Sequence, residues 1–187
     1  MKMIAVPKLL HELFGKKTTG FELWHVLFFA FGMSAVLLGF TFEEWSHLQL
    51  WRVVLLALLL VDICGGVIAN LTWSTNDYYR NQPTARLIFI VVHIQPILFA
   101  ALLADYFPIC LAVWSYTVLA SLIVHSLAGH PAQRAIGASL ALLGAAGLVL
   151  SSGKALPALL LLTLLFYMLK VIYSFGVDHY ASRTNEE

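Results

Sequence analysis

Three ionisable side chains stand inside otherwise apolar segments and are the first candidates for chemistry. They are Asp62, His93 and Lys170. A carboxylate, an imidazole and an amine are groups with which proteins bind and transfer protons. A charge within a bilayer is costly unless it is paired or faces a water-filled cavity. Each of these side chains therefore needs a partner or a cavity.

The composition of the chain predicts a membrane protein. Hydrophobic residues make up 60% of its 187 residues and charged residues only 11%, and the mean hydropathy is +0.85. A soluble domain carries about a quarter charged residues. The formal net charge of +1 provides no case for a clustered basic face, so no nucleic-acid partner is expected. Cys64 and Cys110 fall in different apolar segments, so a disulfide framework is not expected.

The apolar segments predict an all-α fold, a polytopic membrane bundle of six transmembrane helices. Each segment approaches the roughly 20 residues that a bilayer crossing needs. The predicted spans are residues 24–42, 50–71, 86–104, 107–127, 134–151 and 156–177.

The N-terminal residues predict a different kind of element. Leucines and a phenylalanine recur at helical spacing among lysines, which indicates an amphipathic interfacial helix over residues 1–18. The expected organisation is this helix, a bundle over residues 19–178 and a polar cytoplasmic tail over residues 179–187.

The basic residues predict the orientation of the bundle. Short cytoplasmic loops carry an excess of Lys and Arg. If the N-terminus is cytoplasmic, the outer loops hold only Arg52 and Lys154. We therefore expect a multi-pass membrane protein with both termini cytoplasmic. The inner segments would then hold Lys2, Lys8, Lys16, Lys17, Arg80, Arg86, Arg134 and Arg183.

In this orientation the three intramembrane side chains share one level. At 1.5 Å per residue, Asp62 and Lys170 lie roughly 12 Å, and His93 roughly 10 Å, from the inner ends of their helices. We predict that these three carry acid–base chemistry. A purely structural interpretation stays open, in which Asp62 and Lys170 form an ion pair that fixes the helix register.

Pro96 predicts a distortion next to His93. Proline lacks the N–H that would bind the carbonyl of Val92 one turn earlier, so a kink is expected there. Gln95 is expected to point toward a neighbouring helix instead of the site.

Polar residues also gather near the predicted cytoplasmic surface. Hydroxyl, amide and charged groups can together hydrogen-bond a phosphate or carboxylate head group. The residues predicted to bind substrate are Asn70, Thr72, Ser74, Thr75, Asn76, Asp77, Tyr78, Arg80 and Tyr173.

A divalent metal is a further hypothesis for the site. Asp62 and His93, with His125 or His179, would supply oxygen and nitrogen ligands and leave a position for water. No HxxxH, HExxH or CxxC spacing occurs, so each ligand would come from a different helix. Haem is not expected, because His93 and His125, the nearest pair of candidate ligands, lie at different depths.

The fifth predicted span is rich in small residues. Gly137, Ala141 and Ala145 lie four residues apart, a spacing that lets helices approach closely. These residues predict that the fifth span packs closely against another helix. That helix belongs to the same chain or, in a homo-oligomer, to a second copy.

Three functions stay open from these residues. The first is a membrane enzyme, acid–base or metal-assisted, that acts on a lipid or lipid-linked substrate from the cytoplasmic side. The second is a small proton- or ion-coupled transporter or channel that uses the same Asp, His and Lys level. The third is an accessory or scaffold subunit. Membrane lipid is the expected partner in the first case.

Overall fold

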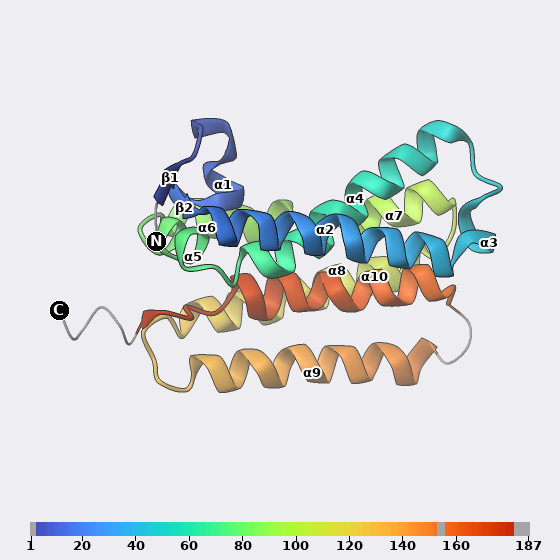
Figure 1. Ribbon diagram of the computed structural model, residues 1–187. Helices are drawn as coiled ribbons and strands as arrows, with labels where there is room; N and C mark the ends of the chain where they lie inside the picture. The colour runs from blue at the N-terminus through green and yellow to red at the C-terminus, as the bar shows by residue number, and fades with distance from the viewer. Residues whose placement is uncertain (1–2, 153–155, 182–187) are drawn as a thin grey trace.

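Six helical spans lie side by side along one direction (Figure 1). The computed structural model describes residues 3–152 and 156–181. Each span is long and apolar enough to cross a membrane, which supports a multi-pass membrane protein. The spans are α2 (Gly20–Phe40), α4 (Leu50–Ala69), the broken helix α6 (Pro83–Val92) and α7 (Gln95–Leu103), α8 (Phe107–Ser126), α9 (Gln133–Ser152), and α10 (Ala158–Met168) continued by the π-helix η2 (Leu169–Phe175).

The start of α2 shows why this span begins four residues before its predicted start. The hydroxyl of Thr19 accepts a hydrogen bond from the Glu22 backbone N–H at 3.1 Å. The Glu22 carboxylate accepts one from the Thr19 N–H at 3.0 Å. This reciprocal capping box satisfies N–H groups that have no partner within the helix.

The predicted amphipathic helix over residues 1–18 is wrong. Strands β1 (Met3–Ala5) and β2 (Lys17–Thr19) pair antiparallel. Between them lie one 3₁₀ turn, η1 (Lys8–Leu10), and the four-residue α1 (His11–Phe14). Pro7 before the turn lacks a backbone N–H. Gly15 ends α1 at φ +68° and ψ −175°, a conformation essentially restricted to glycine.

Gly15 also fixes this N-terminal segment on the bundle. A Cβ atom at Gly15 would lie 2.2 Å from the carbonyl oxygen of Ser74. Ser74 belongs to α5 (Trp73–Arg80), a short helix in the connection between the second and third predicted spans. Thr72 caps α5, and the hydroxyl of Thr75 donates to the carbonyl of Leu13 at 3.0 Å. The N-terminal segment and α5 therefore form one covering layer at this end.

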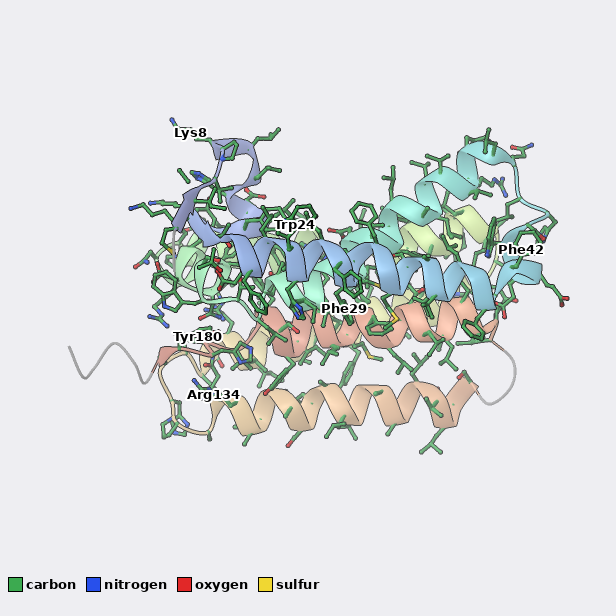
Figure 2. All side chains as sticks on the ribbon, in the orientation of Figure 1. Lys8, Trp24, Phe29, Phe42, Arg134 and Tyr180 are labelled. Atoms are coloured by element: carbon green, nitrogen blue, oxygen red, sulfur yellow. The ribbon has the colours of Figure 1, made fainter. Side chains whose placement is uncertain are left out.

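The two described ends of the chain lie at the same end of the bundle. Lys8 and Tyr180 lie there, and Phe42 of the short helix α3 (Phe42–Trp45) lies at the opposite end (Figure 2). An even number of spans requires this arrangement. Lys2, Lys154, Arg183 and most of the predicted tail lie outside the described residues. The cytoplasmic sidedness of the termini stays a prediction.

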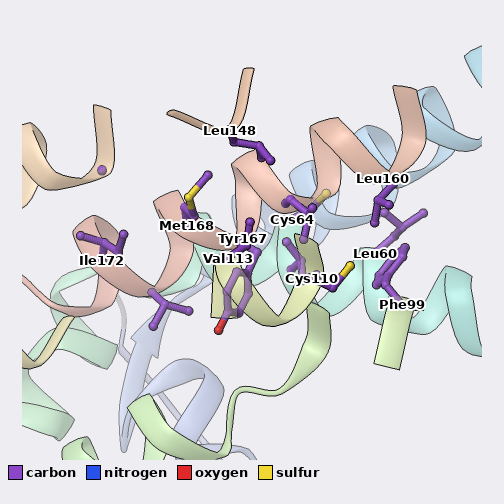
Figure 3. Packing of buried hydrophobic residues seen from close by; sticks show 14 of the residues in the cluster. Leu60, Cys64, Phe99, Cys110, Val113, Leu148, Leu160, Tyr167, Met168 and Ile172 are labelled. Atoms are coloured by element: carbon purple, nitrogen blue, oxygen red, sulfur yellow. The ribbon is translucent and has the colours of Figure 1, made fainter. Parts of the chain in front are cut away.

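Apolar side chains fill the bundle toward the α3 end. Leu60, Phe99 and Leu160 meet there and are fully buried (Figure 3). Leu56 and Leu164 extend the same cluster. Because lipid tails are as apolar as leucine, close packing between helices, more than burial from water, stabilises such a core.

Helix α9 packs through its small residues, as predicted for that span. A Cβ atom at Gly137 would lie 2.6 Å from Val177, and one at Gly144 would lie 2.4 Å from the ring of Tyr116. Part of the small-residue face is thus used within the chain. Ala141 and Ala145 also line an apolar groove of about 500 Å³ between α9 and α10. Association of two copies through α9 stays a prediction.

Candidate functional site

An ion pair joins helix α4, the second span, to the π-helix η2 at the end of the last span. Lys170 Nζ lies 2.8 Å from Asp62 Oδ2, between residues 108 positions apart in sequence. The amide of Gln95 donates to the same oxygen at 2.9 Å. The prediction that Gln95 points away from the site is wrong. The available signal was an amide in an apolar run, directly before the proline that breaks the helix.

Local backbone features allow Lys170 to reach Asp62. Lys170 lies in the π-helix η2, a wider turn that often occurs at functional sites. It passes over Gly66, one turn after Asp62, where a Cβ atom would lie 2.3 Å from Lys170 Cε. Gly66 therefore leaves the space that the lysine side chain occupies.

His93 lies at a break in its helix, and the distortion predicted from Pro96 is confirmed. Its φ of −76° and ψ of 69° are those of an inverse γ-turn. The Ile94 N–H donates to the Val92 carbonyl at 2.8 Å across that turn. The hydroxyl of Tyr167 satisfies the His93 carbonyl at 2.7 Å.

The hydrogen bonding of the His93 ring assigns its tautomer. Nδ1 is bound to the carbonyl oxygen of Phe89. A carbonyl can only accept, so Nδ1 carries the proton, and Nε2 of the neutral ring is left as an acceptor. An imidazole held in this way can accept a proton or bind a donor through Nε2.

Asp62, His93 and Lys170 line one cavity of about 410 Å³. The sequence predicted that these three share a level, and the structure brings them together. Helix α4 and the Phe89 side of α6 form its walls, and the N-terminal segment covers it. The remaining lining residues are Leu9, Glu12, Leu13, Gly66, Ala69, Asn70, Tyr79, Ala85, Ile88, Phe89 and Val92.

The cavity reaches the outer surface of the bundle along α6. Ile88 and Val92 line the cavity and are nevertheless 56% and 58% exposed. Residues on this face of a span would contact lipid tails. The cavity therefore combines an apolar opening at its side with the polar groups of Asp62 and His93 in its wall.

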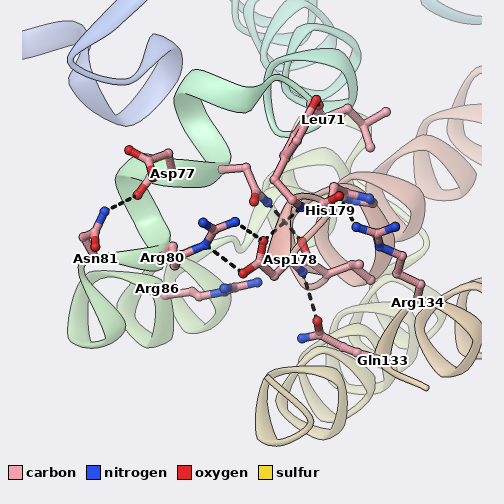
Figure 4. Close-up of polar contacts among 12 residues, drawn as sticks. Leu71, Asp77, Arg80, Asn81, Arg86, Gln133, Arg134, Asp178 and His179 are labelled. Atoms are coloured by element: carbon pink, nitrogen blue, oxygen red, sulfur yellow. Dashed lines mark hydrogen bonds and ion pairs between the residues drawn. The ribbon is translucent and has the colours of Figure 1, made fainter. Parts of the chain in front are cut away.

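Most of the residues predicted to bind substrate are hydrogen-bonded to the protein itself. Asn76 Nδ2 donates to the carbonyl of Val177 at 3.1 Å, and Arg80 binds Asp178 through two hydrogen bonds of 2.7 and 2.8 Å (Figure 4). Thr72 and Thr75 cap α5 and bind the N-terminal segment. Only Asn70 of the predicted set lines the cavity with Asp62.

The remaining members of that set lie elsewhere at the same end. Ser74, Asp77 and Tyr78 line a second cavity of about 430 Å³, together with Lys16 and Lys17. Tyr173 lines the groove between α9 and α10 and contacts the ring of His179.

Two further polar residues bind the end of the last span. The last carbonyls of a helix have no partner within it. Arg86 Nη2 donates to the carbonyls of Phe175 and Gly176 at 3.0 and 2.8 Å. Gln133 Oε1 accepts from the Asp178 N–H at 3.1 Å (Figure 4). Much of the polar surface at this end therefore holds the segment after η2 in place.

The Arg80–Asp178 pair also changes the titration of its members. Burial by itself raises the pKa of Asp178. The Arg80 hydrogen bonds, the Tyr180 N–H and the charges of Arg80 and Arg86 together outweigh that effect and hold the pKa of Asp178 below 3.8. The same hydrogen bonds raise the pKa of Arg80. Both groups are therefore charged at neutral pH.

The predicted metal ligands are not assembled. Within residues 3–152 and 156–181, no three His, Cys, Asp or Glu side chains are grouped closely enough to hold a metal ion. Asp62 and His93 share the cavity, and His125 lies at the end of α8. His179 Nε2 is bound to the carbonyl of Tyr173 at 3.1 Å. The four candidates come from separate segments, and the packing brings only Asp62 and His93 to the same cavity.

Comparisons of the chain with protein-family models, curated proteins and solved structures find no significant match. The function therefore has to be argued from the geometry of the cavity.

Proposed function

We propose that the protein is an integral-membrane enzyme that acts by acid–base chemistry on a lipid or lipid-linked substrate. The observation that supports this is the cavity of about 410 Å³, which has Asp62 and His93 in its wall and an apolar side opening along α6. An amphiphile fits such a shape. Its head would lie beside Asp62 and His93, and its chain would leave toward the lipid between α4 and α6.

His93 would act as the general base. Its Nδ1–H is committed to the Phe89 carbonyl, so Nε2 is the nitrogen that accepts a proton from a substrate hydroxyl or amine. Asp62 would accept a hydrogen bond from the head group and orient it. Lys170 would keep Asp62 ionised at its depth in the membrane.

The substrate would enter from the cytoplasmic leaflet. The lysines near the cavity support this side, because basic residues favour cytoplasmic segments. Lys8, Lys16 and Lys17 lie in the N-terminal segment that covers the cavity.

Apolar side chains fill the half of the bundle between the cavity and α3, and this favours an enzyme over a channel. Leu56, Leu60 and Phe99 are each 0% exposed and pack between the cavity and the α3 end. An ion path would have to pass through these side chains.

The proposal is tested by lipid turnover. Purified protein is reconstituted with a mixture of phospholipids and lipid-linked precursors, and products are measured by mass spectrometry. We expect wild-type protein to convert one lipid class, and His93→Ala and Asp62→Asn to lose at least about 100-fold in rate. Glu43→Gln, an exposed carboxylate at the opposite end, is the matched control for the loss of a charge. Full turnover by both cavity variants would refute the proposal.

A second candidate function is supported by the broken span. Transporters bind solutes where a transmembrane helix is interrupted, and α6 and α7 are interrupted at His93. Proton or solute flux into proteoliposomes tests this candidate. Flux that stops in His93→Ala while no lipid is converted would favour the transporter over the enzyme.

A further inference from the structure

The charge that the cavity presents to a ligand comes mainly from Asp62. The side chain of Lys170 is 2% exposed and that of Asp62 is 39% exposed. Both donors to Asp62, from Lys170 and Gln95, bind Oδ2. Within the described chain, Oδ1 receives no hydrogen bond. A ligand in the cavity therefore meets a carboxylate oxygen that is ready to accept a hydrogen bond, while the lysine lies behind it.

Two further polar side chains of the cavity offer acceptors, and the buried Asn70 adds one amide donor, Nδ2, that has no partner within the described residues. His93 lines the cavity, and its tautomer leaves Nε2 as the acceptor. Glu12 lines the rim with an exposed side chain. The Glu12 carboxylate is near Tyr79, because it contributes, after burial, to raising the pKa of the Tyr79 hydroxyl. Two carboxylates and one ammonium line the cavity, and the ammonium, that of Lys170, is the buried member.

Aromatic rings form part of the same wall. Tyr79, Phe89 and His93 all line the cavity. Phe89 lies against the ring of His93, with centroids 3.5 Å apart, and stacks on Phe175 at 3.7 Å. Both faces of Phe89 are thus covered by other rings, so this part of the wall is apolar and does not itself bind a cation. The preference for a charge therefore comes from the Asp62 and Glu12 carboxylates, which suit a positively charged head much better than an anionic one.

We infer that the cavity takes an amphiphile whose head carries a positive charge, a primary or quaternary ammonium group, on a single apolar chain or on a lipid. This inference rests on the proposed function in one respect, that the cavity is the substrate site. The ammonium would lie against Asp62 Oδ1, in the cavity that Glu12 also lines. A primary amine would in addition donate a hydrogen bond to His93 Nε2, which a quaternary ammonium cannot do.

The inference is tested with probes of equal chain length and different head charge. Dodecylamine, dodecyltrimethylammonium, dodecanol and laurate are titrated into the full-length protein in maltoside micelles, and bound probe is measured by native mass spectrometry. We expect dodecylamine to bind at least about tenfold more tightly than laurate or dodecanol. Asp62→Asn removes this preference, and Glu12→Gln reduces it about threefold. Glu43→Gln, the matched control, leaves it unchanged.

The outcomes separate the inference from the proposed function. Equal or tighter binding of laurate, still lost in Asp62→Asn, overturns the ammonium head group and keeps the cavity as the binding site. Binding of all four probes that is unchanged in Asp62→Asn and Glu12→Gln overturns both. Should Asp62→Asn fail to fold, the exposed Glu12→Gln and the Asp62→Asn/Lys170→Met double variant decide the same question.

Discussion

The hydroxyl of Tyr167 donates a hydrogen bond of 2.7 Å to the backbone carbonyl of His93. The two residues are 74 positions apart in sequence, and the bond joins α10 to the break between α6 and α7. Pro96 lacks an N–H, and the Ile97 N–H binds the Ile94 carbonyl instead of that of His93. Tyr167 therefore supplies a donor to a carbonyl that its own helix leaves unpaired, and it fixes the turn that presents His93 to the cavity.

Tyr167→Phe removes that donor and leaves the His93 carbonyl without its partner. We expect a loss of about 1–3 kcal/mol in the free energy of unfolding, because an unpaired buried polar group is costly. Turnover and dodecylamine binding should fall as well, since the turn at His93 is less fixed. Tyr116→Phe is the matched control, because its hydroxyl donates to Leu140 between α8 and α9. A drop in binding as large in Tyr116→Phe as in Tyr167→Phe would show that the effect is only one of general stability.

The two members of the Asp62–Lys170 pair should differ in their contribution to stability. Asp62→Asn leaves a lysine that is 2% exposed without its counter-charge, at a cost of about 3 kcal/mol. Lys170→Met should cost less, because Asp62 is 39% exposed to the cavity and keeps the hydrogen bond from Gln95. Thermal unfolding of both variants and of the double variant measures this. Single-variant losses that add up in the double variant would mean that the two charges do not interact.

Gly66→Ala tests whether the side chain of Lys170 needs the space that Gly66 leaves on the surface of α4. The new methyl group would lie 2.3 Å from Lys170 Cε, so the buried side chain has to move and the ion pair lengthens. We expect weaker probe binding and a lower melting temperature. Gly39→Ala in α2 is the matched control, because a Cβ atom there has no neighbour within 4 Å. Alanine is the better helix former by about 1 kcal/mol, so Gly39→Ala should be neutral or stabilising. A Gly66→Ala protein that behaves like Gly39→Ala would contradict the placement of Lys170.

The Arg80–Asp178 pair predicts a pH dependence of stability. The pKa of Asp178 lies below 3.8 in the folded protein, so its contribution is fully present above pH 3.8 and is lost as pH falls through the folded pKa. Arg80→Ala removes both hydrogen bonds and the adjacent charge, so the pKa of Asp178 rises, because only the Tyr180 N–H and the Arg86 charge then oppose burial. The difference in unfolding free energy between wild type and variant should be about 1–3 kcal/mol at neutral pH and should shrink below pH 3.8.

Thermal unfolding between pH 3 and pH 7 checks this prediction. Burial also lowers the pKa of His179 from 6.5, so both proteins should lose some stability as pH falls below 6.5. That loss largely cancels in the difference between them. Lys8→Ala, which removes an exposed cation at the same end, is the control. A wild-type–variant difference that does not change with pH would contradict the pairing.

The spans and the level of the intramembrane charges could be predicted from the sequence. A run of about 20 apolar residues is a strong and local signal, and all six spans were predicted within a few residues. Counting along straight helices then placed Asp62 and Lys170 at a common depth, and they are paired in the structure. The break at His93 also had a local cause, the missing N–H of Pro96.

The partners of the polar residues near the chain ends could not be predicted. Asn76, Arg80 and Arg86 have the chemistry of a head-group site, yet they bind the segment that follows the π-helix. Arg80 and Asp178 are 98 positions apart. Nothing in the sequence around either residue indicates that the other is its partner. The prediction of an N-terminal helix was wrong for a different reason. Its leucine spacing was helical, but Pro7 and Gly15 divide the segment into short pieces.

Photo-crosslinking of a lipid into the cavity tests the central claim most directly. The probe is an amine-headed lipid with a diazirine close to its head, reconstituted with the protein, and labelled peptides are mapped by mass spectrometry. We expect labelling of α4 and α6 near Asp62 and His93 that dodecylamine competes away. Val92→Trp, which fills the side opening, should abolish this labelling, and Leu150→Trp, an exposed position on α9, should not. Labelling of the cavity walls that persists in Val92→Trp and in excess dodecylamine, or labelling confined to outer faces such as α9, would contradict the account.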